Sequence, residues 1–154
     1  MQVSEILRVK GNTLFTVTPE TMLSDGVIVM AEHDIGSLVV MEHGRLAGML
    51  TFREVLRVLA KRQVEHRTGP TPPVAEIRVR EVMNPRPTLV APDTDVNELR
   101  RLMIETHQRY LPVMDGHVLL GVISFLDVAR AVLEEQSFEN QMLKAYIRDW
   151  PAEA

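Results

Sequence analysis

The sequence contains two copies of one short pattern, separated by a fixed distance along the chain. Residues 121–127 (GVISFLD) repeat the pattern of residues 48–54 (GMLTFRE), which lie 73 positions earlier (121 − 48 = 73). Each copy has a glycine, two apolar residues, a residue with a hydroxyl group, a phenylalanine, one variable residue and then an acidic residue. The same offset holds outside the pattern, where it pairs Pro19 with Pro92, Val40 with Val113 and Met41 with Met114. Such self-similarity predicts two copies of one structural unit.

The composition limits the classes of protein to which the chain can belong. Its 154 residues suit one domain or a tight pair of small ones, and 45% of them are hydrophobic, which suffices to bury a core. No apolar run approaches the roughly 20 residues that span a bilayer, and no basic-then-apolar leader occurs, so we expect a cytoplasmic protein without a membrane role. The absence of cysteine excludes disulfides. The net charge of −4 argues against nucleic-acid binding.

Each copy is predicted to contain a strand, a helix, two further strands and a second helix, which makes the chain an α+β protein. In the first copy, alternating or continuous apolar runs predict strands at 13–17, 37–41 and 46–51. Helical spacing of apolar residues predicts helices from Pro19 to about Glu32 and from Phe52 onward. Before these elements, residues 4–7 are expected to form a turn and residues 8–12 a loop.

The second copy repeats this order after a proline-rich linker. Three prolines and a glycine within residues 66–73 exclude a helix or a central strand there. The expected elements of the second copy are strands at 88–91, 110–114 and 118–124 and helices at 93–107 and 125–148. The chain is therefore divided into a first repeat (1–65), a linker (66–78), a second repeat (79–136) and a C-terminal helical extension with a tail (137–154).

The two junctions between strand and helix carry the polar residues of the repeated pattern. Thr51 and Glu54 match a capping box, in which side chains at a helix start accept backbone N–H groups. This interpretation and a ligand-binding one stay open at the first junction. At the second junction Asp127 is one methylene shorter than Glu, so we expect it to cap its helix less well and to point more freely at a ligand. A carboxylate can accept both hydroxyls of a ribose, and helix N-termini favour phosphate.

Taken together, these residues resemble the CBS-domain family over nearly the whole chain, from about Val3 to Gln136. The resemblance rests on matched pairs of motifs: residues 18–21 (TPET) with 91–94 (APDT), residues 36–40 (GSLVV) with 110–113 (YLPV), and the two junctions. It implies two βαββα repeats that pack with pseudo-two-fold symmetry into one module. It also implies that the cleft between them holds an adenosine ligand. AMP is expected first, and ADP, ATP, NAD and S-adenosylmethionine are alternatives.

The resemblance further implies two unequal sites, each shared between the repeats. The main site would consist of Asp127, Ser124, Val122, Arg109, Lys10, Gly11, Asn12, Ile35 and Gly36. Arg109 is either a phosphate ligand there or a solvated surface guanidinium, and both interpretations stay open. The family has Asp where the first junction has Glu54, so the second site is expected to be weaker. It would consist of Thr51, Glu54, Asn84, Thr88, Tyr110 and Leu111.

As to function, the resemblance implies a regulatory module that senses a nucleotide and signals by conformational or oligomeric change. It also implies a homodimer through the apolar faces of the helices beginning at Phe52 and Phe125, and an unidentified protein target in trans. Residues 137–150 either continue the dimer contact or pack on their own module. A nucleotide-hydrolysing enzyme and a dimerisation scaffold without a ligand are the alternatives. No phosphate-binding glycine loop or nucleophile elbow occurs, and the five histidines lack metal-ligand spacing, so neither catalytic nor metal-binding residues are predicted.

Overall fold

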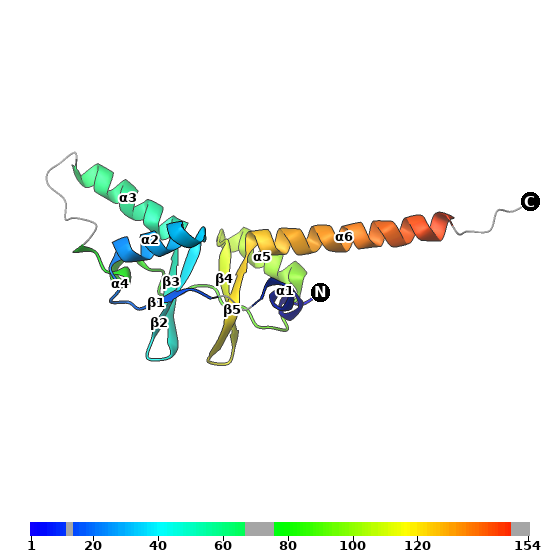
Figure 1. Ribbon diagram of the computed structural model, residues 1–154, viewed down its shortest axis with the longest axis horizontal. Helices are drawn as coiled ribbons and strands as arrows, with labels where there is room; N and C mark the ends of the chain where they lie inside the picture. The colour runs from blue at the N-terminus through cyan, green and yellow to red at the C-terminus, as the bar shows by residue number, and fades with distance from the viewer. Residues whose placement is uncertain (12–13, 67–75, 149–154) are drawn as a thin grey trace, which may run out of the picture.

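The chain folds into two repeats that lie side by side, each with a small sheet covered by helices (Figure 1). The computed structural model describes residues 1–11, 14–66 and 76–148. The first sheet has the order β1 (Thr16–Val17), β2 (Ser37–Glu42), β3 (Arg45–Thr51), and the second pairs β4 (Tyr110–Asp115) with β5 (Val118–Ser124). The helices are α1 (Val3–Lys10), α2 (Leu23–His33), α3 (Phe52–His66), α4 (Val79–Val82), α5 (Val96–Thr106) and α6 (Phe125–Arg148). The expected α+β class is confirmed.

The two hairpins are duplicates of each other down to their irregularities. Strands β2 and β3 pair antiparallel with a register shift after Val40, and β4 and β5 do so with a shift after Val113, its counterpart in the repeat. Each turn contains a glycine with a positive φ, Gly44 and Gly116, a conformation that glycine adopts without steric cost. Both predicted hairpins are therefore present at the predicted positions.

Each repeat is completed by the segment that precedes the other repeat. Helix α1 packs on the second repeat, where Val3 and Ile6 are buried in its core and the Val3 N–H donates to the Thr94 carbonyl at 2.9 Å. The segment around α4 packs on the first repeat in the same manner, and the Leu23 N–H donates to the Ile77 carbonyl at 2.8 Å. The two cores therefore depend on segments that cross between the repeats.

The prediction of a turn at residues 4–7 and a loop from residue 8 is wrong, because these residues form α1. Val3, Ile6 and Leu7 are spaced three and four apart, so one helical face can be buried against the second repeat. The helix ends at Gly11, which has a φ of 90°. Asn12, the end of the expected loop, lies outside the described residues.

The first helix of each repeat begins later than predicted, because a threonine turn precedes it. The Thr18 N–H donates to the Thr21 hydroxyl at 3.1 Å, and the Ala91 N–H donates to the Thr94 hydroxyl at the same distance. Side-chain hydrogen bonds of this kind compete with helix formation. Helices α2 and α5 consequently start at Leu23 and Val96 instead of residues 19 and 93.

The first strand of each repeat is shorter than predicted. In the first repeat only Thr16 and Val17 are in β1, and residue 13 lies outside the described part. In the second repeat the expected strand at 88–91 is reduced to one parallel bridge between Val90 and Val113.

Helix α6 runs from Phe125 to Arg148 as predicted, and its second half leaves the module (Figure 1). Val128 is buried and Val132 is partly buried, whereas all of residues 133–148 except Ala145 are exposed. The alternative in which the C-terminal extension packs on its own module is therefore wrong for the described residues. No helix in the described ranges combines the length and the apolar character that a membrane span requires.

The repeats meet through a small apolar contact and two close approaches at glycine. Val39 and Met49 of the first sheet are buried against Val122 of the second. A Cβ at Gly48 would lie 2.5 Å from the backbone oxygen of Asn84, whereas a Cβ at Gly121, its counterpart, would lie 3.0 Å from a methyl group of Leu7. At both positions the lack of a side chain leaves room for a segment that crosses between the repeats.

We expect Gly48→Ala to destabilise the fold by about 1–3 kcal/mol, the usual cost of overpacking. The Asn84 backbone cannot retreat alone, because the Met49 N–H and the Asn84 carbonyl form a 3.0 Å hydrogen bond. Gly121→Ala is the matched control and should cost less, because the end of a leucine side chain can shift. Urea denaturation of the two variants measures the difference. Equal losses of stability would contradict this account of the crossing.

Candidate functional site

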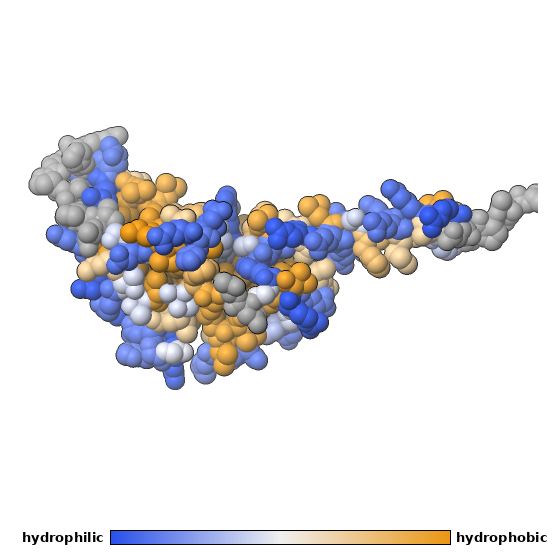
Figure 2. Space-filling view, in the orientation of Figure 1, coloured by the Kyte–Doolittle hydropathy of each residue, from blue (hydrophilic) through white to orange (hydrophobic). Residues whose placement is uncertain are grey.

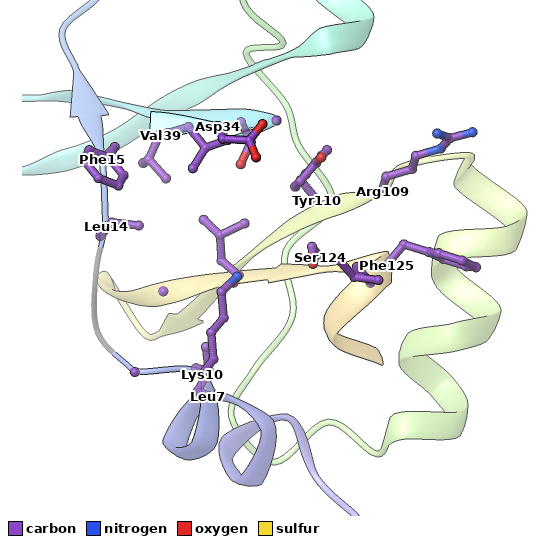
Figure 3. A pocket seen from close by; sticks show the side chains of 17 residues that line it. Leu7, Lys10, Leu14, Phe15, Asp34, Val39, Arg109, Tyr110, Ser124 and Phe125 are labelled. Atoms are coloured by element: carbon purple, nitrogen blue, oxygen red, sulfur yellow. The ribbon is translucent and has the colours of Figure 1, made fainter. Parts of the chain in front are cut away.

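A cavity of about 520 Å³ opens between the two repeats, and we call it the first cavity (Figure 3). Its wall is built from the end of α1, the turn between α2 and β2, and the junction of β5 with α6. Seven of the nine residues predicted for the main site line it: Lys10, Gly11, Ile35, Gly36, Arg109, Val122 and Ser124. Asn12 lies outside the described residues, and Asp127 lies behind the wall in contact with Lys10 and Ser124.

The exchanged helix α1 brings Lys10 to the second junction. The Lys10 ammonium donates to Asp127 Oδ2 at 2.7 Å and to the Val122 carbonyl at 2.7 Å. Figure 3 shows this side chain extending from α1 toward the second sheet. The side chain of Asp127 is 12% exposed and that of Lys10 is 34% exposed, so the ion pair is partly shielded from solvent. Lys10 therefore joins the N-terminal helix to the end of β5 and the start of α6.

The expectation that Asp127 caps its helix poorly is wrong. The Ser124 N–H donates to Asp127 Oδ2 at 2.9 Å, and the Asp127 N–H donates to the Ser124 hydroxyl at 3.1 Å. This is the reciprocal pair of a capping box. The shorter carboxylate reaches the N–H while keeping a bond to Lys10. Capping and ion pairing both use Oδ2, and no described residue hydrogen-bonds to the other carboxylate oxygen.

The balance of forces at Asp127 lowers its pKa below the ordinary value of 3.8. Burial alone would raise the pKa, because it disfavours the charged carboxylate. The hydrogen bond from Lys10, the backbone N–H of Ser124 and the charge of Lys10 together outweigh burial. Since the folded-state pKa is lowered, this carboxylate stabilises the fold above about pH 3.8, and the contribution is lost as the pH falls through the lowered pKa.

We expect Lys10→Met to raise the pKa of Asp127, because burial would remain while the compensating cation is removed. A ¹³C NMR titration of the Asp127 carboxyl measures this pKa directly. The control is Arg8→Met, which removes a neighbouring cation of α1 and leaves the Lys10–Asp127 ion pair intact. An unchanged titration midpoint in Lys10→Met would show that the ion pair does not hold the carboxylate ionised.

Tyr110 and Arg109 form a wall that the first cavity shares with a second one. Tyr110 packs so closely on Gly36 that any side chain at position 36 would collide with its phenol group. Arg109 is exposed, and Figure 3 shows its guanidinium pointing away from Lys10 and Ser124. Arg109 therefore lines the cavity as an exposed residue, and both interpretations of its guanidinium stay open.

The second cavity measures about 1000 Å³ and lies beside the first junction. Four of the six residues predicted for the second site line it: Thr51, Glu54, Asn84 and Tyr110. Thr88 and Leu111 do not, since Leu111 is fully buried in the core of the second repeat. Glu54 is 7% exposed and accepts hydrogen bonds from the Thr51 N–H at 3.0 Å and the Thr51 hydroxyl at 2.8 Å. The capping interpretation of the first junction therefore agrees with the structure.

Several lining residues were missed by the sequence reasoning. Leu14, Phe15, Asp34 and Val39 line the first cavity, and the Phe15 ring stacks on His33 with centroids 4.2 Å apart. These residues flank predicted ones in the sequence, but only the crossing of the repeats brings them together. Within the described ranges no group of three His, Asp or Glu side chains lies close enough to hold a metal ion.

Two repeats with exchanged segments and a cleft between them define a tandem module, and the chain belongs to the CBS-domain family. The family model for the CBS domain matches residues 3–61 and 79–134. A mitochondrial CBS domain-containing protein of Arabidopsis thaliana, CBSX3, is 32% identical over 95% of this chain and 71% of its own length. The suspected family membership is therefore confirmed.

Solved structures with the same fold extend the comparison. A protein with CBS domains from Burkholderia ambifaria, for which a role in signal transduction is proposed, has a TM-score of 0.76 at 33% identity, covering 88% of this chain and 96% of its own. The structure of CBSX2 in complex with AMP has a TM-score of 0.70 at 25% identity, covering 88% of this chain and 98% of its own. At least one structural neighbour of this chain therefore binds an adenosine nucleotide.

Proposed function

We propose that the chain is a regulatory module that binds an adenosine nucleotide, AMP in the first instance, in the first cavity. The observation that carries this proposal is the assembly of Lys10, Ser124 and Asp127 at a cavity between the repeats. The AMP complex of the structural neighbour CBSX2 supports the choice of ligand. At about 520 Å³, the cavity is within the range of small-molecule sites.

The ligand would be held by an exchange of partners at Asp127. Lys10 donates to this carboxylate at 2.7 Å. The two hydroxyls of a ribose can replace the ammonium as donors to a carboxylate. Lys10 would then be free to pair with the phosphate, and Ile35 and Val122 would offer apolar surface to the base. One ion pair would thus be replaced by two ligand contacts.

This exchange gives a route from binding to signalling. Lys10 belongs to α1, whereas Asp127 belongs to α6, the helix that projects from the module. A ligand that breaks the Lys10–Asp127 pair favours a different packing of α1 on the second repeat. A protein partner that recognises one packing would then respond to the nucleotide, which is a population shift.

We expect AMP to raise the melting temperature of the wild-type chain by several degrees. Ligand at 100 times its dissociation constant adds about 2.7 kcal/mol, which has this effect in a protein of this size. The shift should vanish in Asp127→Ala and persist in Asp115→Ala, which removes an exposed carboxylate that lines neither cavity. ADP, ATP, NAD and S-adenosylmethionine are measured in parallel, and a larger shift with one of them names the ligand instead.

The same experiment separates the alternatives. No shift with any of the five ligands, in protein free of copurified nucleotide, would refute the sensor and favour a dimerisation scaffold. Chromatography of the nucleotide after incubation tests for hydrolysis, and a product would make the chain an enzyme. The cytoplasmic location stays a prediction, since the relative CBSX3 carries a mitochondrial name.

We also propose that the chain forms a homodimer through α3 and α6. Helix α3 exposes Phe52, Leu56 and Leu59, and α6 exposes Leu126 and Leu133 on its half next to the module. Figure 2 shows hydrophobic surface over α3 and at intervals along the projecting part of α6. Exposed apolar surface on two helices of one module favours contact with another apolar face.

We expect the double variant Leu59→Glu and Leu133→Glu to dissociate the dimer, because both side chains are more than half exposed and line neither cavity. Analytical ultracentrifugation of wild type and variant measures the mass. Val118→Glu is the control, since it places the same charge on an exposed valine at the β4–β5 turn. A monomeric wild type, or a dimer that survives the double variant, would contradict the interface.

A further inference from the structure

The end of α6 projects from the module and carries exposed apolar side chains. The family model ends at residue 134, whereas α6 continues to Arg148. We call residues 135–148 the projecting half, and in Figure 1 it extends away from both sheets. Its large apolar side chains are all at least 57% exposed: Phe138, Met142, Leu143, Tyr146 and Ile147. The projecting half lines neither cavity, so these residues serve neither the repeats nor the cleft between them.

The spacing of these residues is that of a helix that packs on another helix. Phe138, Met142 and Ala145 recur at intervals of four and three, so they share one face. This alternation is the pattern of a coiled-coil seam, and the 14 residues of the projecting half (148 − 134 = 14) span about two heptads. A protein helix of this length owes most of its stability to the packing of its apolar face. A second helix is therefore the expected cover for the seam.

The charges of the segment are divided between its two ends. Glu134, Glu135 and Glu139 lie at or next to its start. Lys144 and Arg148 lie toward its end. Two copies aligned in parallel would place like charges side by side, which destabilises a helix pair. Two copies aligned antiparallel place the acidic start of each against the basic end of the other. The segment is thus complementary to itself in one orientation only.

We propose that the projecting half of α6 pairs antiparallel with the same segment of a second copy of the chain. Knobs-into-holes packing of the two seams sets Phe138 of each copy beside Met142 of the other, with a two-fold axis between them. In this alignment Glu134 of each copy lies opposite Arg148 of the other. The two Gln141 side chains meet beside the axis.

This contact is separate from the proposed homodimer through α3 and α6, and it rests neither on that dimer nor on nucleotide binding. About two heptads form a small interface, and small interfaces are weak. The pairing is therefore expected at high protein concentration, where it joins two dimers into a tetramer. At low concentration the projecting halves are apart, and the mass of the protein reports the contact through α3 and α6 alone.

Chemical cross-linking of the full chain tests the orientation, because the chain contains no cysteine. With a short bis-maleimide, Gln141→Cys should form a covalent pair. Asn140→Cys is the matched control, since position 140 is equally exposed but faces away from the seam and should not cross-link. Glu134→Cys alone should not cross-link either, because its two copies lie roughly 21 Å apart along the helix pair. A mixture of Glu134→Cys and Arg148→Cys should.

Sedimentation equilibrium over a range of concentrations tests the seam itself. Phe138→Asp should weaken the association seen at high concentration about tenfold or more and leave the melting temperature unchanged, since this side chain is exposed. Glu139→Gln should strengthen the association, because the two Glu139 side chains meet on the other edge of the seam. If the wild type is a monomer at low concentration, the same changes apply to a monomer–dimer equilibrium, so failure of the proposed homodimer is distinguishable.

Three results would overturn the proposal. Equal cross-linking of Gln141→Cys and Asn140→Cys would show random collision. Cross-linking of Glu134→Cys alone would show a parallel pair. An association that Phe138→Asp leaves unchanged would show that the seam is not the contact, and would leave it as a surface for a different protein.

Discussion

The exchange of N-terminal segments between the repeats is the constraint on which the rest of the structure depends. Helix α1 supplies Val3 and Ile6 to the core of the second repeat, and Ile77 and Val79 join the core of the first. Neither repeat can bury its apolar face without a segment from outside its own hairpin and helices. The exchange also carries Lys10 to the second junction, so the candidate site is a by-product of how the cores are completed.

The two junctions differ in their hydrogen bonds for two reasons. Glu54 is one methylene group longer than Asp127, and Lys10 reaches Asp127 from α1. At the first junction Glu54 folds back on Thr51 and is satisfied within a few residues. At the second, Asp127 caps its helix and also receives a cation from a segment more than a hundred residues away in the sequence. Because burial disfavours the charged form, the partly buried carboxylate of Asp127 needs such compensation to keep its pKa low. The bond at Glu54 is local, whereas the bond at Asp127 joins two segments that are distant in the sequence.

The sequence predicted the repeat, the hairpins and the helices α3 and α6, because regular apolar patterns at a fixed offset specify them. It failed where short segments take their structure from distant partners. The helical spacing of Val3, Ile6 and Leu7 was the available signal for α1, but its burial depends on the second repeat. The hydrogen bonds of Asn84 and Gln108 in the wall of the second cavity could not be predicted, since they depend on the local folding of residues 84–88 and 106–108.

Arg109 and Tyr110 connect the two cavities physically, because both residues line each of them. Tyr110 is held against Gly36, and Arg109 O accepts the N–H of Phe125 at 2.8 Å at the start of α6. A ligand that moves either side chain from one cavity changes the wall of the other. The guanidinium of Arg109 cannot pair fully with an anion in each of the two cavities at the same time. If both cavities bind phosphate groups, competition for Arg109 makes their affinities depend on each other, and by linkage that dependence is equal in both directions.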